Sequence, residues 1–221
     1  MYRDWELWDR YGKETLLAHV GDKCRGVNNP VRDKLAELIS KVPISDRNIL
    51  DIGCGSGIEY MALHKKLNPD FSYTGLDITS EQIEIANERF KNSHYNNVCF
   101  SVGDIFDIPN DCFKANAYDI VISKYVLEHL PPPIQDTKYN YKEALINLTK
   151  FDCKYLVLGF YLGLGENTAI NLCDDGFYRN CYGIEEICTI LNNNNITQIE
   201  VHFIQTLHIK KKAVLLWCKR K

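Results

Sequence analysis

The feature that most constrains this chain is the stretch 49–57, where a short apolar run leads into three closely spaced glycines. Its first four residues are typical of a buried strand, and residues 58–67 have the pattern of a helix. Between them lie Gly53, Gly55 and Gly57. Glycine allows a tight turn and lets a ligand lie against bare backbone amides, while a helix N-terminus adds partial positive charge. A strand, a glycine turn and a helix in this order predict a ligand-binding unit.

The spacing of these glycines argues against a dinucleotide site. A G-x-G-x-x-G pattern would place its last glycine at position 58, where this chain has Ile58. Asp51, two residues before the first glycine, is a poor neighbour for a pyrophosphate and would instead suit a ligand that carries a cationic amine. The turn therefore predicts a nucleotide-like ligand of another kind.

From residue 48 on, apolar strand patterns alternate with helical patterns, after a first helix that starts at Pro30 and ends before Pro43. Strands are predicted at 48–52, 71–76, 97–102, 118–123, 153–161, 196–204 and 211–219, and helices at 58–67, 80–90, 139–150 and 183–192. The alternation indicates βαβ units and a mostly parallel sheet. The last two strands are joined by residues 205–210, which are too few for a crossover, so the last strand must be antiparallel. The predicted fold class is α/β, a Rossmann-like seven-stranded mostly parallel sheet with an antiparallel last strand and helices on both faces.

The composition fits a globular domain with a short N-terminal extension: 45% of the 221 residues are hydrophobic and 25% are charged. Residues 1–29, which carry Trp5, Trp8 and Tyr11, are expected to form a lid over a pocket or a helix packed on the main domain, 30–221. The net charge of −3 gives no electrostatic footprint for nucleic acid. No apolar run approaches the ~20 residues that cross a bilayer. We therefore expect neither nucleic acid nor membrane as a partner, and the oligomeric state stays open.

The nine cysteines are odd in number and form no C-x-x-C motif. Zinc sites and disulfide frameworks both predict tighter patterning, so we expect small core thiols and no metal site. Cys173 and Cys181 are the only pair in a loop-like segment, where a disulfide or a metal is the alternative. The cysteine pattern, with an N-terminus too polar for a signal peptide, favours a reducing cytoplasm.

In parallel sheets ligands bind at the carboxyl ends of the strands, and acidic residues stand at two of these ends. Asp77 closes the second strand, twenty positions after Gly57, where an acid can take the hydroxyls of a ribose with both oxygens. Asp104 follows the third strand and could accept from an amino group, with Ile78 and Ile105 on either side of a flat ring. The alternatives are that Asp77 only caps the next helix and that Asp104 is a turn residue.

Four motifs, in chain order and at the right strand ends, resemble those of class I S-adenosylmethionine-dependent methyltransferases. They are D-I-G-C-G-S-G at 51–57, G-L-D-I at 75–78, G-D-I-F at 103–106, and Y-D-I-V-I-S at 118–123 followed by L-E-H-L at 127–130. The resemblance runs from about residue 30 to the C-terminus. It implies S-adenosylmethionine as cofactor, with its methionine part at Asp51 and the backbone of Gly53, Cys54, Gly55 and Gly57, its ribose at Asp77, its adenine at Ile78, Asp104 and Ile105, and its ammonium at the backbone of Ser123.

Two further residues are assigned by the resemblance with an alternative for each. Arg25 could pair with the methionine carboxylate, as upstream arginines do in some relatives, or be an ordinary surface residue. His129 could be a catalytic base or a structural histidine, and a base is needed only if the acceptor must lose a proton. Methyl transfer itself is an in-line displacement in which positioning and a dry pocket supply much of the rate.

The acceptor is predicted to be a small molecule with an oxygen or nitrogen nucleophile. The N-P-P-Y motif of many nucleic-acid and protein N-methyltransferases is replaced by S-K-Y-V at 123–126, no Pro-Cys dipeptide occurs, and no basic face is present. The long segment after the fifth strand lacks clear periodicity, which is more often functional than not. The candidate substrate contacts are Tyr11, Tyr161, Tyr178, Arg179 and Asn180, and Arg179 would suit a phosphate or carboxylate. The alternatives are a self-packed loop, a protein or RNA acceptor with a recognition partner, and a non-catalytic binding module.

Overall fold

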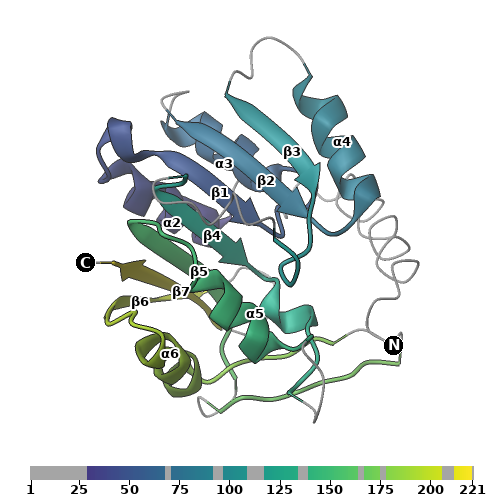
Figure 1. Cartoon of the computed structure of the whole chain (residues 1–221), viewed down its shortest axis with the longest axis vertical. Coiled ribbons are helices and arrows are strands. Elements are labelled where there is room, and N and C mark those ends of the chain that lie inside the picture. Colours follow the sequence, from purple (N-terminus) through teal and green to yellow (C-terminus); the bar gives the residue numbers. More distant parts are fainter. Residues whose placement is uncertain are drawn as a thin grey trace. The chain divides into compact units, whose positions relative to one another are not determined.

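The computed structural model describes residues 29–67, 71–91, 97–108, 117–133, 139–163, 167–174, 178–205 and 212–220. They fall into two compact units, one that ends at Asp104 and one that starts at Ile105. The seven strands follow the order β3-β2-β1-β4-β5-β7-β6 (Figure 1). Their bounds are β1 Asn48–Ile52, β2 Ser72–Asp77, β3 Val98–Val102, β4 Ile120–Lys124, β5 Tyr155–Tyr161, β6 Gln198–Gln205 and β7 Lys212–Lys219.

The first unit pairs β1 with β2 and β2 with β3, both in parallel. Its helices are α2 Pro30–Ser40, α3 Ile58–Leu67 and α4 Ser80–Phe90, and α4 packs on β2 and β3. The side-chain oxygen of Asn29 accepts from Val31 N at 2.9 Å and caps α2. Residue 29 thus belongs to this helix, and the rest of the expected N-terminal lid lies outside the described residues.

Aromatic rings fill the core of the first unit. The ring centroid of Tyr60 in α3 lies 5.3 Å from that of Tyr73 in β2 and 5.0 Å from that of Phe90 in α4. Phe90 in turn stacks on Phe100 of β3 at 5.4 Å. Aromatic pairs at such distances stabilise a core beyond the area they bury. One cluster therefore anchors both α3 and α4 to β2 and β3.

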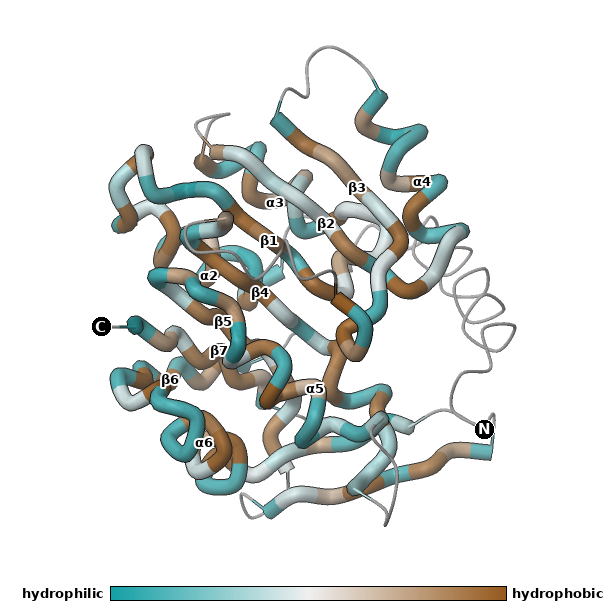
Figure 2. The backbone as a smooth tube through the Cα atoms, in the orientation of Figure 1, coloured by the Kyte–Doolittle hydropathy of each residue, from teal (hydrophilic) through white to brown (hydrophobic). Residues whose placement is uncertain are grey.

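In the second unit β4 pairs with β5 in parallel, while β7 runs antiparallel to both β5 and β6. The predicted fold class, with its reversed last strand, is confirmed. The 3₁₀ helix η3, Leu127–His129, follows β4, and the helices α5, Tyr141–Leu148, and α6, Ile184–Asn193, pack against each other. β5 and β7 are buried along most of their length, as their hydrophobic colouring indicates (Figure 2).

The segment after β5 is more regular than its sequence indicates. It forms a two-stranded arm, defined here as residues 167–174 and 178–182. Ala169 bridges Cys181 and Leu172 bridges Tyr178, both in antiparallel fashion. Isolated bridges impose no alternation of polar and apolar residues, which explains why the segment shows no strand periodicity in its sequence. The pairing agrees with the alternative of a self-packed loop.

Among the described residues no helix is long and apolar enough to cross a membrane. Within the same residues, no three or more His, Cys, Asp and Glu side chains gather as a metal site would require. Cys173 and Cys181 are both free thiols.

Candidate active site

The glycine turn follows β1 and has a left-handed backbone at three positions. The φ angle is 80° at Gly53, 53° at Gly55 and 75° at Gly57, values that other residues rarely adopt. The expectation of bare amides is wrong at four positions. The amides of Gly53 and Cys54 donate to Leu76 O, that of Gly55 to the Asp77 carboxylate, and that of Gly57 to Cys54 O. The turn is therefore fixed before any ligand binds, and a ligand must use the space that the missing side chains leave.

Replacing Gly57 by alanine is expected to cost about 3 kcal/mol of unfolding free energy, because a left-handed residue costs ~1 kcal/mol and overpacking adds roughly 1–3 kcal/mol. A Cβ atom at Gly57 would lie 2.6 Å from Phe90 Cε2 and 2.9 Å from Phe100 Cζ. Gly55→Ala is the matched control, since its φ is also positive but its Cβ would meet only Gln82 Oε1, at 3.7 Å. That variant should lose only about 1 kcal/mol. Urea unfolding measures both, and equal losses would contradict the packing argument.

Asp77 links the glycine turn to the start of α4. Its Oδ2 accepts from Gly55 N at 2.8 Å, and its Oδ1 accepts from Thr79 N at 2.9 Å. Asp77 thus contacts the start of α4, as the alternative prediction of a helix-capping role expected, in addition to its contact with the glycine turn. Each carboxylate oxygen keeps a second lone pair, so the same group can still accept two hydroxyls. The ribose contact stays a prediction.

Arg89 holds the same turn from the last turn of α4. Its Nη1 donates to Ser56 O at 2.6 Å and lies 3.3 Å from Ser56 Oγ, and burial lowers the pKa of the guanidinium. Sequence reasoning missed this residue. No local signal could have found it, because 33 positions separate the two partners.

Asp51 and Cys54 are both buried beside the turn. Asp51 accepts a hydrogen bond from the hydroxyl of Tyr73. Burial, with the nearby charge of Asp51, raises the pKa of the Cys54 thiol well above its ordinary value of 9.0. The thiol therefore stays protonated near neutral pH and is no nucleophile. The pairing of Asp51 with a ligand amine stays a prediction.

The predicted adenine residues stand at strand ends in both units. Ile78 and Asp104 are half-buried, and Gly103 N donates to Asp77 O at 2.9 Å, which ties the end of β3 to the end of β2. In the second unit Ile105 is buried, and its carbonyl accepts from Asn147 Nδ2 at 3.1 Å. Their contacts with a ligand stay predictions.

Ser123 lies near the carboxyl end of β4 and is 2% exposed. Its Oγ is buried and has no hydrogen-bond partner among the described residues. A buried hydroxyl without a partner costs free energy, so it indicates a place where a ligand atom or a water completes the structure. This fits the predicted neighbourhood of a ligand's ammonium group.

His129, the last residue of η3, is held in one tautomer. Its Nδ1 lies 3.1 Å from Tyr178 O, and because a carbonyl can only accept, Nδ1 must carry the proton. In the neutral imidazole Nε2 is then the proton-accepting atom. Burial lowers the pKa of His129 below its ordinary 6.5, the Tyr178 carbonyl opposes this, and the charge of Arg179 lowers it further. A neutral imidazole with a fixed lone pair has the properties of a general base.

Asn180, a predicted substrate contact, is instead a structural link and must be corrected. It is 1% exposed, its Nδ2 donates to Leu130 O at 2.7 Å, and its backbone N donates to Glu128 O at 2.9 Å. Its Oδ1 accepts from Asn171 N within the arm. With its amide thus engaged, Asn180 docks the arm on η3 and so places Tyr178 O against His129.

The other predicted substrate residues differ in how far they are buried. Tyr178 is buried and contributes its carbonyl, Arg179 is exposed, and Tyr161 is half-buried at the end of β5. Tyr11 and Arg25 lie outside the described residues.

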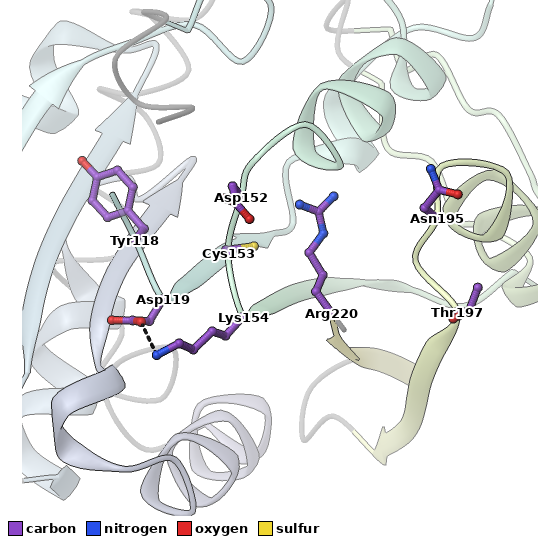
Figure 3. Close-up of a pocket in the computed structure, with 8 residues that line it drawn as sticks. All are labelled: Tyr118, Asp119, Asp152, Cys153, Lys154, Asn195, Thr197 and Arg220. Atoms are coloured by element: carbon purple, nitrogen blue, oxygen red, sulfur yellow. Dashed lines mark ion pairs between the residues drawn. The ribbon is translucent and has the colours of Figure 1, made fainter. Parts of the chain in front are cut away.

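A separate pocket of about 590 Å³ lies beside the residues that directly precede β4 and β5 in the chain (Figure 3). It is lined by Tyr118, Asp119, Asp152, Cys153, Lys154, Asn195, Thr197 and Arg220, none of which is a predicted site residue. Lys154 Nζ pairs with Asp119 Oδ1 at 3.1 Å, and Arg220 donates to Thr149 O and Phe151 O. These charges are used within the fold, so the pocket is not the candidate active site.

Three features together define a class of α/β proteins that bind nucleotide-like ligands. They are a glycine turn after β1, an acid at the end of β2 and another after β3, and a reversed last strand. A model of the methyltransferase domain family matches residues 44–201, more than half of the chain, and the protein belongs to this family.

Known relatives share the domain and differ in what they modify. Ajmaline N-methyltransferase of Rauvolfia serpentina is 36% identical over 138 residues, 56% of this chain and 45% of that protein. Release factor glutamine methyltransferase of Streptococcus pneumoniae is 35% identical over 100 residues, 44% of this chain and 33% of that protein. The matched segments thus span less than half of either relative.

A similar fold occurs in 1,6-didemethyltoxoflavin-N1-methyltransferase of Burkholderia thailandensis, crystallised with 1,6-didemethyltoxoflavin and S-adenosylhomocysteine. The TM-score is 0.70 with 12% identity, over 100% of this chain and 89% of that one. At this identity the likeness concerns the fold alone.

Proposed function

We propose that this protein transfers a methyl group from S-adenosylmethionine to a small molecule, at an oxygen or nitrogen atom. The observation that carries the proposal is His129, whose Nδ1 proton is held by Tyr178 O so that Nε2 can accept a proton. Support comes from the family match and from a relative named for a small molecule, ajmaline. The cytoplasmic location expected from the cysteines belongs to the same proposal.

The described residues fit the cofactor in three ways. The turn is open on the side of Gly55, where a Cβ would meet one atom only, so an amino-acid tail has room. Asp77 offers two lone pairs at the end of β2 for ribose hydroxyls. The buried Ser123 hydroxyl has no described hydrogen-bond partner, and a ligand's ammonium could donate to it. When bound, S-adenosylmethionine supplies a methyl group activated by a sulfonium charge.

The proposed role of His129 is to accept the proton that the acceptor loses. Nε2 would receive the proton that the acceptor's oxygen or nitrogen loses on methylation, and the imidazole would become an imidazolium. The electron pair of the broken carbon–sulfur bond would stay on sulfur, so the sulfonium would become a neutral thioether. The hydrogen bond from Nδ1 to Tyr178 O keeps the ring oriented through this step. Because the arm places this carbonyl, the arm is part of the catalytic geometry.

A protein acceptor is the second candidate, favoured by the relative named for release factor glutamine. The two classes are separated by incubating the protein with methyl-labelled S-adenosylmethionine and a cell extract, then dividing the products by size. We expect label in the low-mass filtrate, and no such label with His129→Asn. Label confined to acid-insoluble protein or RNA would overturn the small-molecule proposal.

A further inference from the structure

The hydroxyl of Tyr182 joins the end of the arm to the start of η3. Tyr182 is 0% exposed, and its hydroxyl donates to Leu127 O, the carbonyl of the first residue of η3. Its backbone is fixed beside the end of β5, because Tyr182 N donates to Tyr161 O at 2.9 Å and Gly163 N donates to Tyr182 O at 3.1 Å. Burial raises the pKa of the phenol above its ordinary 10.0, so the hydroxyl remains a donor near neutral pH. Tyr182 thus connects a fixed point of the sheet to η3.

Asn180 holds the other end of the same 3₁₀ helix. Its Nδ2 donates to the carbonyl of Leu130, which directly follows η3, at 2.7 Å, and to the Tyr182 hydroxyl at 3.2 Å. Its backbone N donates to Glu128 O, in the middle of η3, at 2.9 Å. Two residues of the arm therefore supply donors to three carbonyls of the segment 127–130. We call Asn180 and Tyr182 the clamp.

The clamp determines how the ring of His129 meets the arm. His129 Nδ1 lies 3.1 Å from Tyr178 O, and the ring belongs to η3 whereas the carbonyl belongs to the arm. Hydrogen bonds weaken steeply as their angle worsens, so the two groups stay paired only while η3 and the arm keep one relative position. A histidine whose Nδ1 loses its acceptor can populate both neutral tautomers. In one of them Nε2 carries the proton and cannot accept another.

We propose that Tyr182 is a positioning residue for methyl transfer: together with Asn180 it holds η3 against the arm and so keeps His129 in the tautomer whose Nε2 can accept a proton. The proposal rests on the proposed function, because the base that Tyr182 positions belongs to that reaction. Tyr182 acts through η3 and takes no proton itself.

The test compares Tyr182→Phe with its matched control, Tyr141→Phe. Both tyrosines are buried, their ring centroids are 4.8 Å apart, and each substitution removes only a hydroxyl. The hydroxyl of Tyr141, however, donates to Glu186 Oε1 in α6, at 2.7 Å, and not to η3. Tyr182→Phe should fold, because Leu127 O keeps a second donor, Leu130 N at 3.1 Å.

The first readout is the tautomer of His129 in the full chain at about pH 8, where the imidazole is neutral. It is obtained from the ¹⁵N chemical shifts of the ring nitrogens, assigned by comparison with His129→Asn. We expect the wild type to carry the proton on Nδ1, and Tyr182→Phe to lower the ratio of this tautomer to the other by about tenfold, the net contribution of one hydrogen bond. Tyr141→Phe should match the wild type. Equal ratios in the wild type and Tyr182→Phe, or an equal fall in both variants, would overturn the proposal.

Asn180→Ser is a second variant, which removes the donor to Leu130 O and should lower the same ratio. If Tyr182→Phe does not fold, an unchanged ratio in Asn180→Ser overturns the proposal.

The second readout is the rate of methyl transfer from labelled S-adenosylmethionine to the low-mass compounds of a cell extract. We expect it to fall about tenfold in Tyr182→Phe, in step with the tautomer ratio. If the ratio falls and the rate does not, the proposed function of His129 fails, whereas the hold of the clamp on His129 stands.

Discussion

Replacing His129 with asparagine is expected to lower the rate of methyl transfer by about 10²–10⁴-fold, the usual contribution of a general base. Asparagine can still donate an amide hydrogen to Tyr178 O, the carbonyl 3.1 Å from Nδ1, so the arm keeps its contact. What is lost is the proton acceptor at Nε2. Cofactor affinity should stay unchanged, and an unaffected rate would contradict the role of His129.

The pH dependence of the rate gives this role a second signature. Burial and the charge of Arg179 lower the pKa of His129, so the neutral base predominates above its ordinary 6.5. The rate of the wild type should therefore be flat above pH 6.5 and fall only at lower pH, as Nε2 becomes protonated. Arg179→Gln should shift this fall to higher pH, because a repelling charge is removed. Glu128, the neighbouring acidic residue in η3, is present in both proteins, so it does not contribute to the difference in pH dependence.

Replacing Asp77 with alanine is expected to weaken binding of S-adenosylhomocysteine by at least about 100-fold, since hydrogen bonds to a charged group contribute roughly 1.5–3 kcal/mol each. Two ribose hydroxyls would lose their acceptors. The variant also frees Gly55 N and Thr79 N, which the carboxylate accepts at 2.8 Å and 2.9 Å. A control variant must therefore show how much affinity is lost when only the glycine turn is disturbed. Isothermal calorimetry gives the affinities.

Arg89→Met is the control for that damage. It removes the donor to Ser56 O, a support of the same turn, without touching the predicted ribose acceptor. We expect its affinity for S-adenosylhomocysteine to fall by less than about tenfold, the loss of one hydrogen bond's net contribution. If both variants lose affinity equally, Asp77 acts through the turn and not on the ribose.

Much of the fold could be predicted because its signals are local. Asn48–Ile52 and Ile58–Leu67 match the predicted strand and helix to the residue, since an apolar run and a helical stripe reflect burial directly. The reversed β7 followed from the shortness of 205–210. The positive φ angles of the turn likewise follow from its glycines.

What escaped prediction depends on partners far apart in the chain. Asn180 Nδ2 and Leu130 O are separated by 50 positions, so nothing in the sequence distinguishes a structural amide from one that contacts substrate. The positive φ at Tyr125, whose backbone N donates to Gly159 O on the neighbouring strand, was not predicted either. The turn's amides were expected to be bare, but Leu76 and Asp77 accept from three of them.

Calorimetric titration of the wild-type protein with S-adenosylhomocysteine and, separately, with NAD tests most directly which ligand the glycine turn binds. The amides of the glycine turn donate to acceptors within the protein, and an amino-acid tail has room beside Gly55. The carboxylate of Asp51 is unsuited to a neighbouring pyrophosphate. We predict saturable heat with micromolar affinity for S-adenosylhomocysteine and none for NAD. Absence of binding to S-adenosylhomocysteine, or tighter binding of NAD, would contradict the assignment of S-adenosylmethionine as the cofactor.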